Sequence, residues 1–169
     1  MKTIRVLLTK YGDRTSKFIY LCSGLKGYTH ASLSLEDKPE EYYSFNRRGF
    51  CIETAEKCIR HGVEKSLCYE MEVTEEVFQA LRQRIEIMRR NRERYSYSVL
   101  SMFMALLRIP YQRKQRYVCS TFVAEMLHRS GAMKLHRQPS IIVPNDFPDL
   151  LQEKMQLKGI ITNHFANPY

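Results

Sequence analysis

The sequence predicts a fold that combines β-strands with α-helices, because two hydrophobic periodicities occur along one chain. Alternating polar and apolar residues, which are typical of strands, run through residues 28–35 and 41–46. Apolar residues spaced three and four apart, which are typical of a helix with one buried face, follow Thr74. With 169 residues the chain has the length of one domain at roughly 100–200 residues per domain, so we expect residues 1–169 to form a single domain.

The predicted strands lie in the first half of the chain. Each is a short run of apolar or alternating residues that ends at a cluster of turn-forming residues. These strands are expected at residues 3–9, 28–35, 41–46, 49–53 and 67–73. The second and third are joined by the turn cluster 36–40, which predicts a hairpin. A short helix is expected at residues 16–23, where Gly24 and Gly27 end it.

Three helices are predicted in the second half. The first begins at Thr74, whose hydroxyl can cap the helix N-terminus. Its buried stripe consists of Phe78, Leu81, Ile85 and Met88. A strongly apolar helix follows at residues 98–108, and an amphipathic helix at residues 117–131 has Gly131 as its C-cap. Residues 141–148 are expected to be extended and to end in a turn.

The composition excludes several classes of protein. Hydrophobic residues make up 44% and charged residues 27%, as in globular proteins. No run approaches the roughly 18 apolar residues that cross a bilayer, and the N-terminus lacks the features of a secretory signal. We therefore expect a soluble cytoplasmic protein. The five cysteines are an odd number and contain no C-x-x-C pair, which predicts free thiols and neither a structural metal nor a cofactor.

The net charge of +9 is concentrated between Arg82 and Arg116. That segment holds two acidic residues, Glu86 and Glu93, and ten basic ones, which gives it a charge of +8. The ten are Arg82, Arg84, Arg89, Arg90, Arg92, Arg94, Arg108, Arg113, Lys114 and Arg116. We interpret the cluster first as a solvated helix face, while contact with an anionic surface or ligand, or dimerisation, stays open. No recognition motif accompanies it, so nucleic acid is not an expected partner.

Cys119 is the candidate nucleophile, because it stands in the first turn of a predicted helix directly after a polar loop. Unpaired backbone N–H groups and the helix dipole lower the pKa of a thiol at that position, and the thiolate is the reactive form. The same N–H groups can hold the oxyanion of a tetrahedral intermediate. A cysteine in this position also serves commonly as a small core residue, so its place alone leaves both interpretations open.

His30 is the candidate base. It stands at the head of a predicted strand, on the face opposite the apolar residues, so a thiolate–imidazolium pair with Cys119 would lie on an accessible surface. A third polar group would orient the imidazole. The hairpin places Ser44 and Asn46 nearly opposite His30, and Glu53 on the next strand is a further possibility.

The order of these motifs resembles that of a known family. The residues that carry the resemblance are Tyr-Thr-His-Ala-Ser-Leu-Ser-Leu (28–35), Tyr-Ser-Phe (43–45), Tyr-Val-Cys-Ser-Thr-Phe-Val-Ala (117–124) and Val-Pro-Asn-Asp-Phe (143–147). They resemble the circularly permuted papain-like proteins, the NlpC-type thiol hydrolases of the YiiX-like group, in which the histidine strand precedes the cysteine helix. The lecithin retinol acyltransferase-like enzymes are similar in motif order.

The resemblance implies an α+β fold with an antiparallel sheet, the cysteine helix packed on it and a cleft between them. It also implies that Cys119 is the nucleophile and His30 the base, with an oxyanion donor from the Cys119 backbone and from Tyr117 or the 111–116 loop. Where relatives carry His or Glu after the hairpin, this sequence has Ser44. Asn46 or Glu53 would then substitute, or the site would be weaker than in relatives.

Two classes of function follow from these observations. The first is a cysteine hydrolase of the amidase or peptidase type, or a lipid acyltransferase or thioesterase on the same scaffold, whose substrate is a small molecule, peptide or lipid with an amide or ester bond. The second is a non-catalytic binding module that uses the Arg-rich surface of residues 82–116. The departure at Ser44 motivates the second interpretation.

Overall fold

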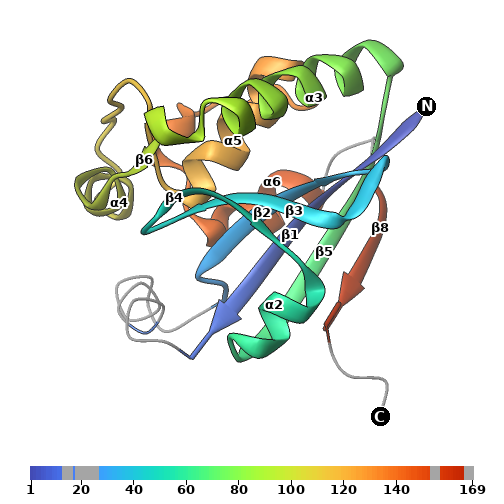
Figure 1. The fold of residues 1–169 in the computed structure, drawn as a ribbon, viewed down its shortest axis with the longest axis horizontal. Helices are drawn as coiled ribbons and strands as arrows, with labels where there is room; N and C mark the ends of the chain where they lie inside the picture. The colour runs from blue at the N-terminus through green and yellow to red at the C-terminus, as the bar shows by residue number, and fades with distance from the viewer. Residues whose placement is uncertain (13–16, 18–26, 153–156, 166–169) are drawn as a thin grey trace.

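A six-stranded antiparallel sheet with helices packed on it makes this an α+β protein (Figure 1). The computed structural model describes residues 1–12, 17, 27–152 and 157–165. The strand order is β4-β3-β2-β1-β5-β8. The strands are β1 (Lys2–Tyr11), β2 (His30–Leu35), β3 (Lys38–Asn46), β4 (Gly49–Glu53), β5 (Val63–Val73) and β8 (Leu157–Thr162).

The helices lie mainly after β5. They are α2 (Ala55–Arg60), α3 (Glu75–Arg90), α4 (Val99–Leu106), α5 (Cys119–Ser130) and α6 (Phe147–Gln152). Single 3-10 turns form η1 (Arg92–Arg94), η2 (Pro139–Ile141) and η3 (Pro144–Asp146), and a parallel pair of two-residue strands joins β6 (Ser96–Tyr97) to β7 (Arg116–Tyr117). Among the described residues, no helix is both long enough and apolar enough to cross a membrane.

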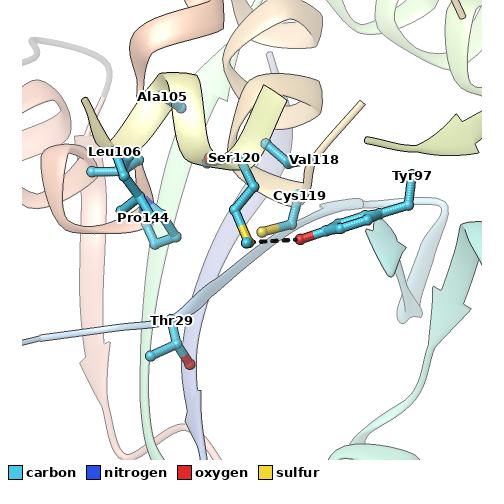
Figure 2. A pocket seen from close by; sticks show the side chains of 10 residues that line it. Thr29, Tyr97, Ala105, Leu106, Val118, Cys119, Ser120 and Pro144 are labelled. Atoms are coloured by element: carbon cyan, nitrogen blue, oxygen red, sulfur yellow. Dashed lines mark hydrogen bonds between the residues drawn. The ribbon is translucent and has the colours of Figure 1, made fainter. Parts of the chain in front are cut away.

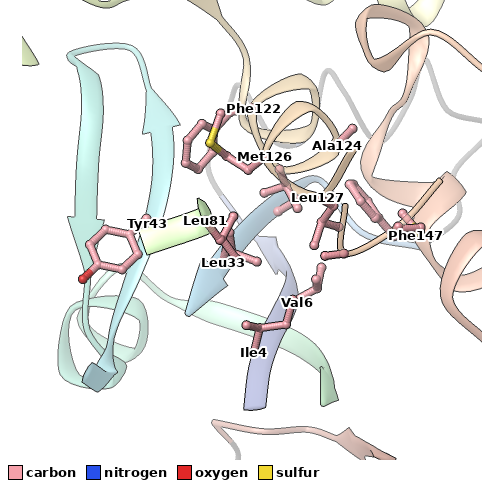
Figure 3. Packing of buried hydrophobic residues seen from close by; sticks show 14 of the residues in the cluster. Ile4, Val6, Leu33, Tyr43, Leu81, Phe122, Ala124, Met126, Leu127 and Phe147 are labelled. Atoms are coloured by element: carbon pink, nitrogen blue, oxygen red, sulfur yellow. The ribbon is translucent and has the colours of Figure 1, made fainter. Parts of the chain in front are cut away.

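The main core lies between one face of the sheet and helices α3, α5 and α6 (Figure 3). Val6 and Leu33 on the sheet, Leu81 on α3, and Phe122 and Leu127 on α5 are all fully buried. Burying each such side chain stabilises the fold by about 1.5–3 kcal/mol. The packing fixes α5 across the sheet, and the first residue of α5 is Cys119.

The structure confirms the predicted strands, the hairpin and the three predicted helices. All four residues of the stripe on α3 are buried, and the hydroxyl of Thr74 accepts a hydrogen bond from Val77. Gly131 ends α5 with φ at 82°, the left-handed conformation that glycine adopts without strain. The predicted helix at residues 16–23 falls outside the described residues except at position 17, which is helical.

Several features of the structure differ from the predictions. Residues 141–148, expected to be extended, instead form parts of η2, η3 and α6. The predictions also lack α2, the short strands β6 and β7, and β8. Strand β8 pairs only with β5 at the edge of the sheet, and it is largely exposed, so it lacks the apolar alternation that identifies a half-buried strand.

Candidate active site

Cys119 begins α5, as its place in the sequence predicts. The chain enters the helix through Val118 in an extended conformation, and the hydroxyl of Thr121 both accepts from the N–H and donates to the carbonyl of Val118, each at 3.1 Å. This turn fixes the start of the helix. The side chain of Cys119 is buried, with 7% of the residue exposed. A first-turn N–H has no partner within the helix, so the backbone at Cys119 can donate to a ligand.

His30 is the first residue of β2, and it forms a hydrogen bond with the Cys119 thiol. The backbone N–H groups of Ala31 and Ser120 also donate to the sulfur. Burial opposes ionisation of this thiol, but the charge of His30 and these hydrogen bonds outweigh burial and lower the pKa of Cys119. The edge of the Tyr11 ring packs on the imidazole, with 5.9 Å between ring centroids.

Glu53 ends β4, and its Oε2 atom lies 3.0 Å from Nε2 of His30. Only 12% of the His30 side chain and 11% of the Glu53 side chain are exposed. Burial alone would lower the pKa of His30, but the charge of Glu53, and then that of the Cys119 thiolate, raise it well above its usual value. Burial likewise opposes ionisation of Glu53, yet the charge of His30 lowers the pKa of this carboxyl.

The structure corrects the predicted orienting group, because neither Ser44 nor Asn46 lies at the imidazole. The Ser44 hydroxyl is buried and donates to the carbonyl of Ala31 at 2.6 Å. The Asn46 side chain instead accepts a hydrogen bond from the N–H of Arg48 within the β3–β4 turn. Of the three candidates, Glu53 alone reaches His30.

Sheet curvature explains this difference. In the strand register Glu53 aligns through Tyr42 with Ser34, which lies four residues beyond His30 in β2, so a flat sheet would keep Glu53 and His30 apart. The end of β4 instead leads into α2, where Cys58 forms a hydrogen bond with Tyr11 at the end of β1. The twisted sheet thus brings the end of β4 back to the start of β2.

Cys119 and His30 are mostly buried, so the prediction that they lie on an accessible surface is wrong. Access is through a small, partly open pocket, with a cavity volume of about 20 Å³, at the N-terminus of α5 (Figure 2). Its walls are largely apolar and come from α4, the start of α5 and η3. The residues that line it are Thr29, Tyr97, Met102, Ala105, Leu106, Val118, Cys119, Ser120, Val143 and Pro144.

Three of the lining residues, Thr29, Tyr97 and Ser120, carry hydroxyl groups. Figure 2 shows the Tyr97 hydroxyl beside the Cys119 sulfur, with its hydrogen bond of 3.3 Å to the sulfur of Met102 drawn as a dashed line. Burial and the charge of Cys119 raise the pKa of Tyr97, which keeps its hydroxyl protonated. The Thr29 hydroxyl is buried and has no partner within the described part of the chain. Tyr117, which with the 111–116 loop was one of two expected sources of an oxyanion donor, donates its hydroxyl to Glu125 at 3.0 Å.

Cys119 differs from the other three cysteines that the structure describes. Burial is the largest influence on all three and raises the pKa of Cys51, of Cys58 and of Cys68, the last to about 12. Among the four cysteines that the structure describes, Cys119 alone, beside His30, has an environment that favours the thiolate. Among the described residues, no three His, Cys, Asp or Glu side chains gather as a metal site would require.

Sequence reasoning predicted that Cys119 and His30 share one site, and the structure brings them together, but it interpreted Tyr97 as a core or interface aromatic and not as part of that site. The Tyr97 ring comes from β6, a strand of two residues whose pairing with β7 has no periodicity to detect. No protein-family model matches this chain, and no curated protein is similar to it at a significant level.

Proposed function

We propose that this protein is a cysteine hydrolase or acyltransferase that cleaves an amide or ester bond through an acyl-enzyme on Cys119. The observation that carries this proposal is the position of His30, which bonds to the Cys119 thiol and to the Glu53 carboxylate. A thiolate is the nucleophilic form, and an imidazolium held by a buried carboxylate stabilises that form at neutral pH. The histidine strand that precedes the cysteine helix, and the antiparallel sheet beneath them, support a permuted papain-like scaffold.

The chemical steps follow from this arrangement. The Cys119 thiolate attacks the carbonyl carbon, a C–S bond forms, and the carbonyl electrons move to the oxygen. We assign the backbone N–H of Cys119 as one donor to that oxyanion, and the Tyr97 hydroxyl, which also lines the pocket, as a second once it leaves the sulfur of Met102. His30 then gives its proton to the leaving oxygen or nitrogen as the C–O or C–N bond breaks. In the second half, His30 takes a proton from water or an acceptor alcohol, which attacks the thioester and releases the thiolate.

The pocket favours an apolar acyl group over a polar peptide. Met102, Ala105 and Leu106 from α4 line it together with Val143 and Pro144. Apolar walls of this kind bind hydrocarbon and leave the hydrogen bonds of a peptide backbone unsatisfied. This observation supports the acyltransferase or thioesterase form of the proposal ahead of a peptidase.

The non-catalytic alternative rested on a serine in place of an orienting carboxylate or histidine. Since Glu53 lies against His30, Ser44 is not needed for that role. A binding module would have no use for a buried carboxylate that holds the imidazole protonated beside a thiol. We therefore prefer the enzyme.

The test uses activated acyl donors, with which any activated thiolate reacts. The protein is incubated with p-nitrophenyl butyrate, p-nitrophenyl octanoate and the matching p-nitroanilides, while product release and intact mass are followed. We expect an acyl adduct that maps to Cys119 and turnover that Cys119→Ala abolishes. Cys68→Ala, which changes a buried thiol in the small cluster with Leu7 and Tyr42, serves as the matched control. Undiminished turnover in a folded Cys119→Ala variant, or no adduct with any donor, contradicts the proposal.

A further inference from the structure

Helix α4 presents an apolar face to solvent. Ser101, Met102 and Ala105 are its buried residues, and they turn toward the protein. The side chains on the opposite face and just beyond the helix are between 42% and 66% exposed. They are Val99, Leu100, Phe103, Leu107 and Ile109. Soluble proteins expose single apolar side chains commonly, but a contiguous group on one short helix marks an interaction surface.

Exposed basic residues precede and follow α4 in the sequence. They are Arg92, Arg94, Arg113, Lys114 and Arg116, and none forms an ion pair with another residue that the structure describes. The pairing of β6 with β7 places Ser96 beside Arg116 and so joins the two basic stretches at the base of α4. Against five cations stands one acid, Glu93, which leaves a charge of +4.

Other arginines of the Arg-rich segment are already neutralised. Arg82 pairs with Asp37, Arg90 with Glu86, and Arg108 with Asp146. Within the described part of that segment, most of the basic residues without an ion pair therefore lie around α4, and Arg84 on α3 is the exception. In Figure 1, α4 lies at one edge of the molecule, away from the strands of the large sheet.

We infer that α4 and its basic border dock on the surface of an anionic lipid bilayer. An exposed apolar face flanked by lysine and arginine is the pattern of a helix that lies in the membrane interface, where its side chains reach the acyl boundary and its cations meet lipid phosphates. An acidic protein surface would match the cations but would not require the apolar side chains. A nucleic acid would leave the apolar side chains unburied in the same way.

The inner face of α4 gives this docking a consequence that rests on the proposed function. Met102, Ala105 and Leu106 form a wall of the pocket that holds Cys119, so one helix separates the pocket from the proposed membrane contact. An acyl chain that leaves the bilayer would meet apolar side chains from α4 on its way to Cys119. Docking itself does not depend on the chemistry at Cys119, and we expect Cys119→Ala to bind vesicles as the unmodified protein does.

The experiment is co-sedimentation of the full chain with vesicles. One set contains phosphatidylcholine alone and the other equal parts of phosphatidylcholine and phosphatidylglycerol. We expect binding to the anionic vesicles that weakens as salt rises. The double variant Phe103→Ser with Leu107→Ser should lose most of this binding. Arg113→Gln with Lys114→Gln should weaken binding by about 25-fold, since each cation near an anionic surface contributes a factor of about five.

Matched controls change the same chemistry elsewhere. Ile87→Ser removes an isoleucine on α3 that is 50% exposed, and Arg60→Gln with Lys134→Gln removes two exposed cations outside the patch. Both should bind as the unmodified protein does. Thermal unfolding checks that every variant is folded.

Three results would overturn the inference. Absence of binding to anionic vesicles is the first. Binding that the charge variants weaken but the apolar variants leave unchanged is the second, because it would mean that electrostatic attraction alone holds the protein on the vesicle and that the apolar face of α4 takes no part. The third is a dimer in light scattering that Leu107→Ser dissociates, which would show that a second copy of this chain covers α4.

Discussion

The Glu53 carboxylate lies 3.0 Å from the imidazole of His30, although β3 separates their two strands in the sheet. Both side chains are nearly buried, so their charges interact with little screening by water. The charge of Glu53 keeps His30 protonated against the effect of burial, and the imidazolium in turn favours the Cys119 thiolate. The reactivity of the Cys119 sulfur therefore depends on the Glu53 carboxylate, which acts on it through His30.

Replacing this carboxylate should move the pH at which Cys119 becomes reactive. Glu53→Gln removes the negative charge that raises the pKa of His30, while His30 stays buried. The pKa of His30 therefore falls, and that of Cys119 rises. Site-resolved alkylation with iodoacetamide should shift to higher pH by about one unit or more, toward the value of about 8.5 for a free thiol. In the unmodified protein, Cys119 should react well below that pH.

Asn46→Ala is the matched control for this shift, because the Asn46 side chain bonds to the β3–β4 turn and not to His30. Its alkylation profile should coincide with that of the unmodified protein. A shift in Asn46→Ala and none in Glu53→Gln would show that Asn46, and not Glu53, orients the His30 imidazole.

Loss of the Tyr97 hydroxyl should slow acyl transfer without changing the thiol. The hydroxyl stands beside Cys119 in the pocket and stays protonated, so it can donate to a developing oxyanion. Tyr97→Phe should lower kcat toward p-nitrophenyl butyrate by about 100-fold, the lower end of the range for one oxyanion donor. Tyr95→Phe, which changes a partly buried tyrosine that packs on the core, should leave kcat unchanged. Equal kcat values for the two variants would remove Tyr97 from the mechanism.

The helix that carries Cys119 and the strand that carries His30 could be predicted from sequence because local patterns define both. The stripe on α3, the C-cap at Gly131 and the alternation through β2 each involve residues within one or two turns or one strand. Packing of α5 on the sheet then brings Cys119 to the head of β2.

The third member of the site could not be predicted in this way. Counting residues across a hairpin treats the sheet as flat and gives Ser44 or Asn46, whereas the contact of Glu53 with His30 depends on twist accumulated over three strands. The pocket wall from α4 depends equally on long-range packing, since the helix meets η2, which is formed more than thirty residues later. Neither contact leaves a local pattern in the sequence.

Gly27 should be important for the stability of the segment that leads into β2 and His30. Its φ is +79°, and a Cβ at this position would overlap Oδ1 of Asn145. That same oxygen accepts the N–H of Tyr28 at 2.6 Å, which ties the start of β2 to η3. Gly27→Ala should therefore lower the free energy of unfolding by about 2–3 kcal/mol, from left-handed strain and displacement of Asn145.

Gly62→Ala separates the two contributions to that loss. Gly62 has a similar φ of +72°, and a Cβ added there would meet nothing within 4 Å, so its replacement carries the backbone strain alone, about 1 kcal/mol. Urea unfolding of both variants measures the difference. Equal losses would mean that Asn145 yields to the added methyl at no cost.

Asp146 should stabilise the wall of the pocket that η3 forms. Its carboxylate takes a bidentate ion pair from Arg108, just beyond α4, and accepts the N–H of Val143 at 2.9 Å. Because Arg108 is 46% exposed, water screens the ion pair, and we expect Asp146→Asn to lower the free energy of unfolding by only about 1 kcal/mol. For a chain of this size that loss corresponds to a Tm about 2–4 °C lower. Asp37→Asn, which breaks the more exposed pair with Arg82, should change Tm by less. The same fall in Tm for both variants would show that the contacts of Asp146 with Arg108 and Val143 add nothing beyond an ordinary surface ion pair.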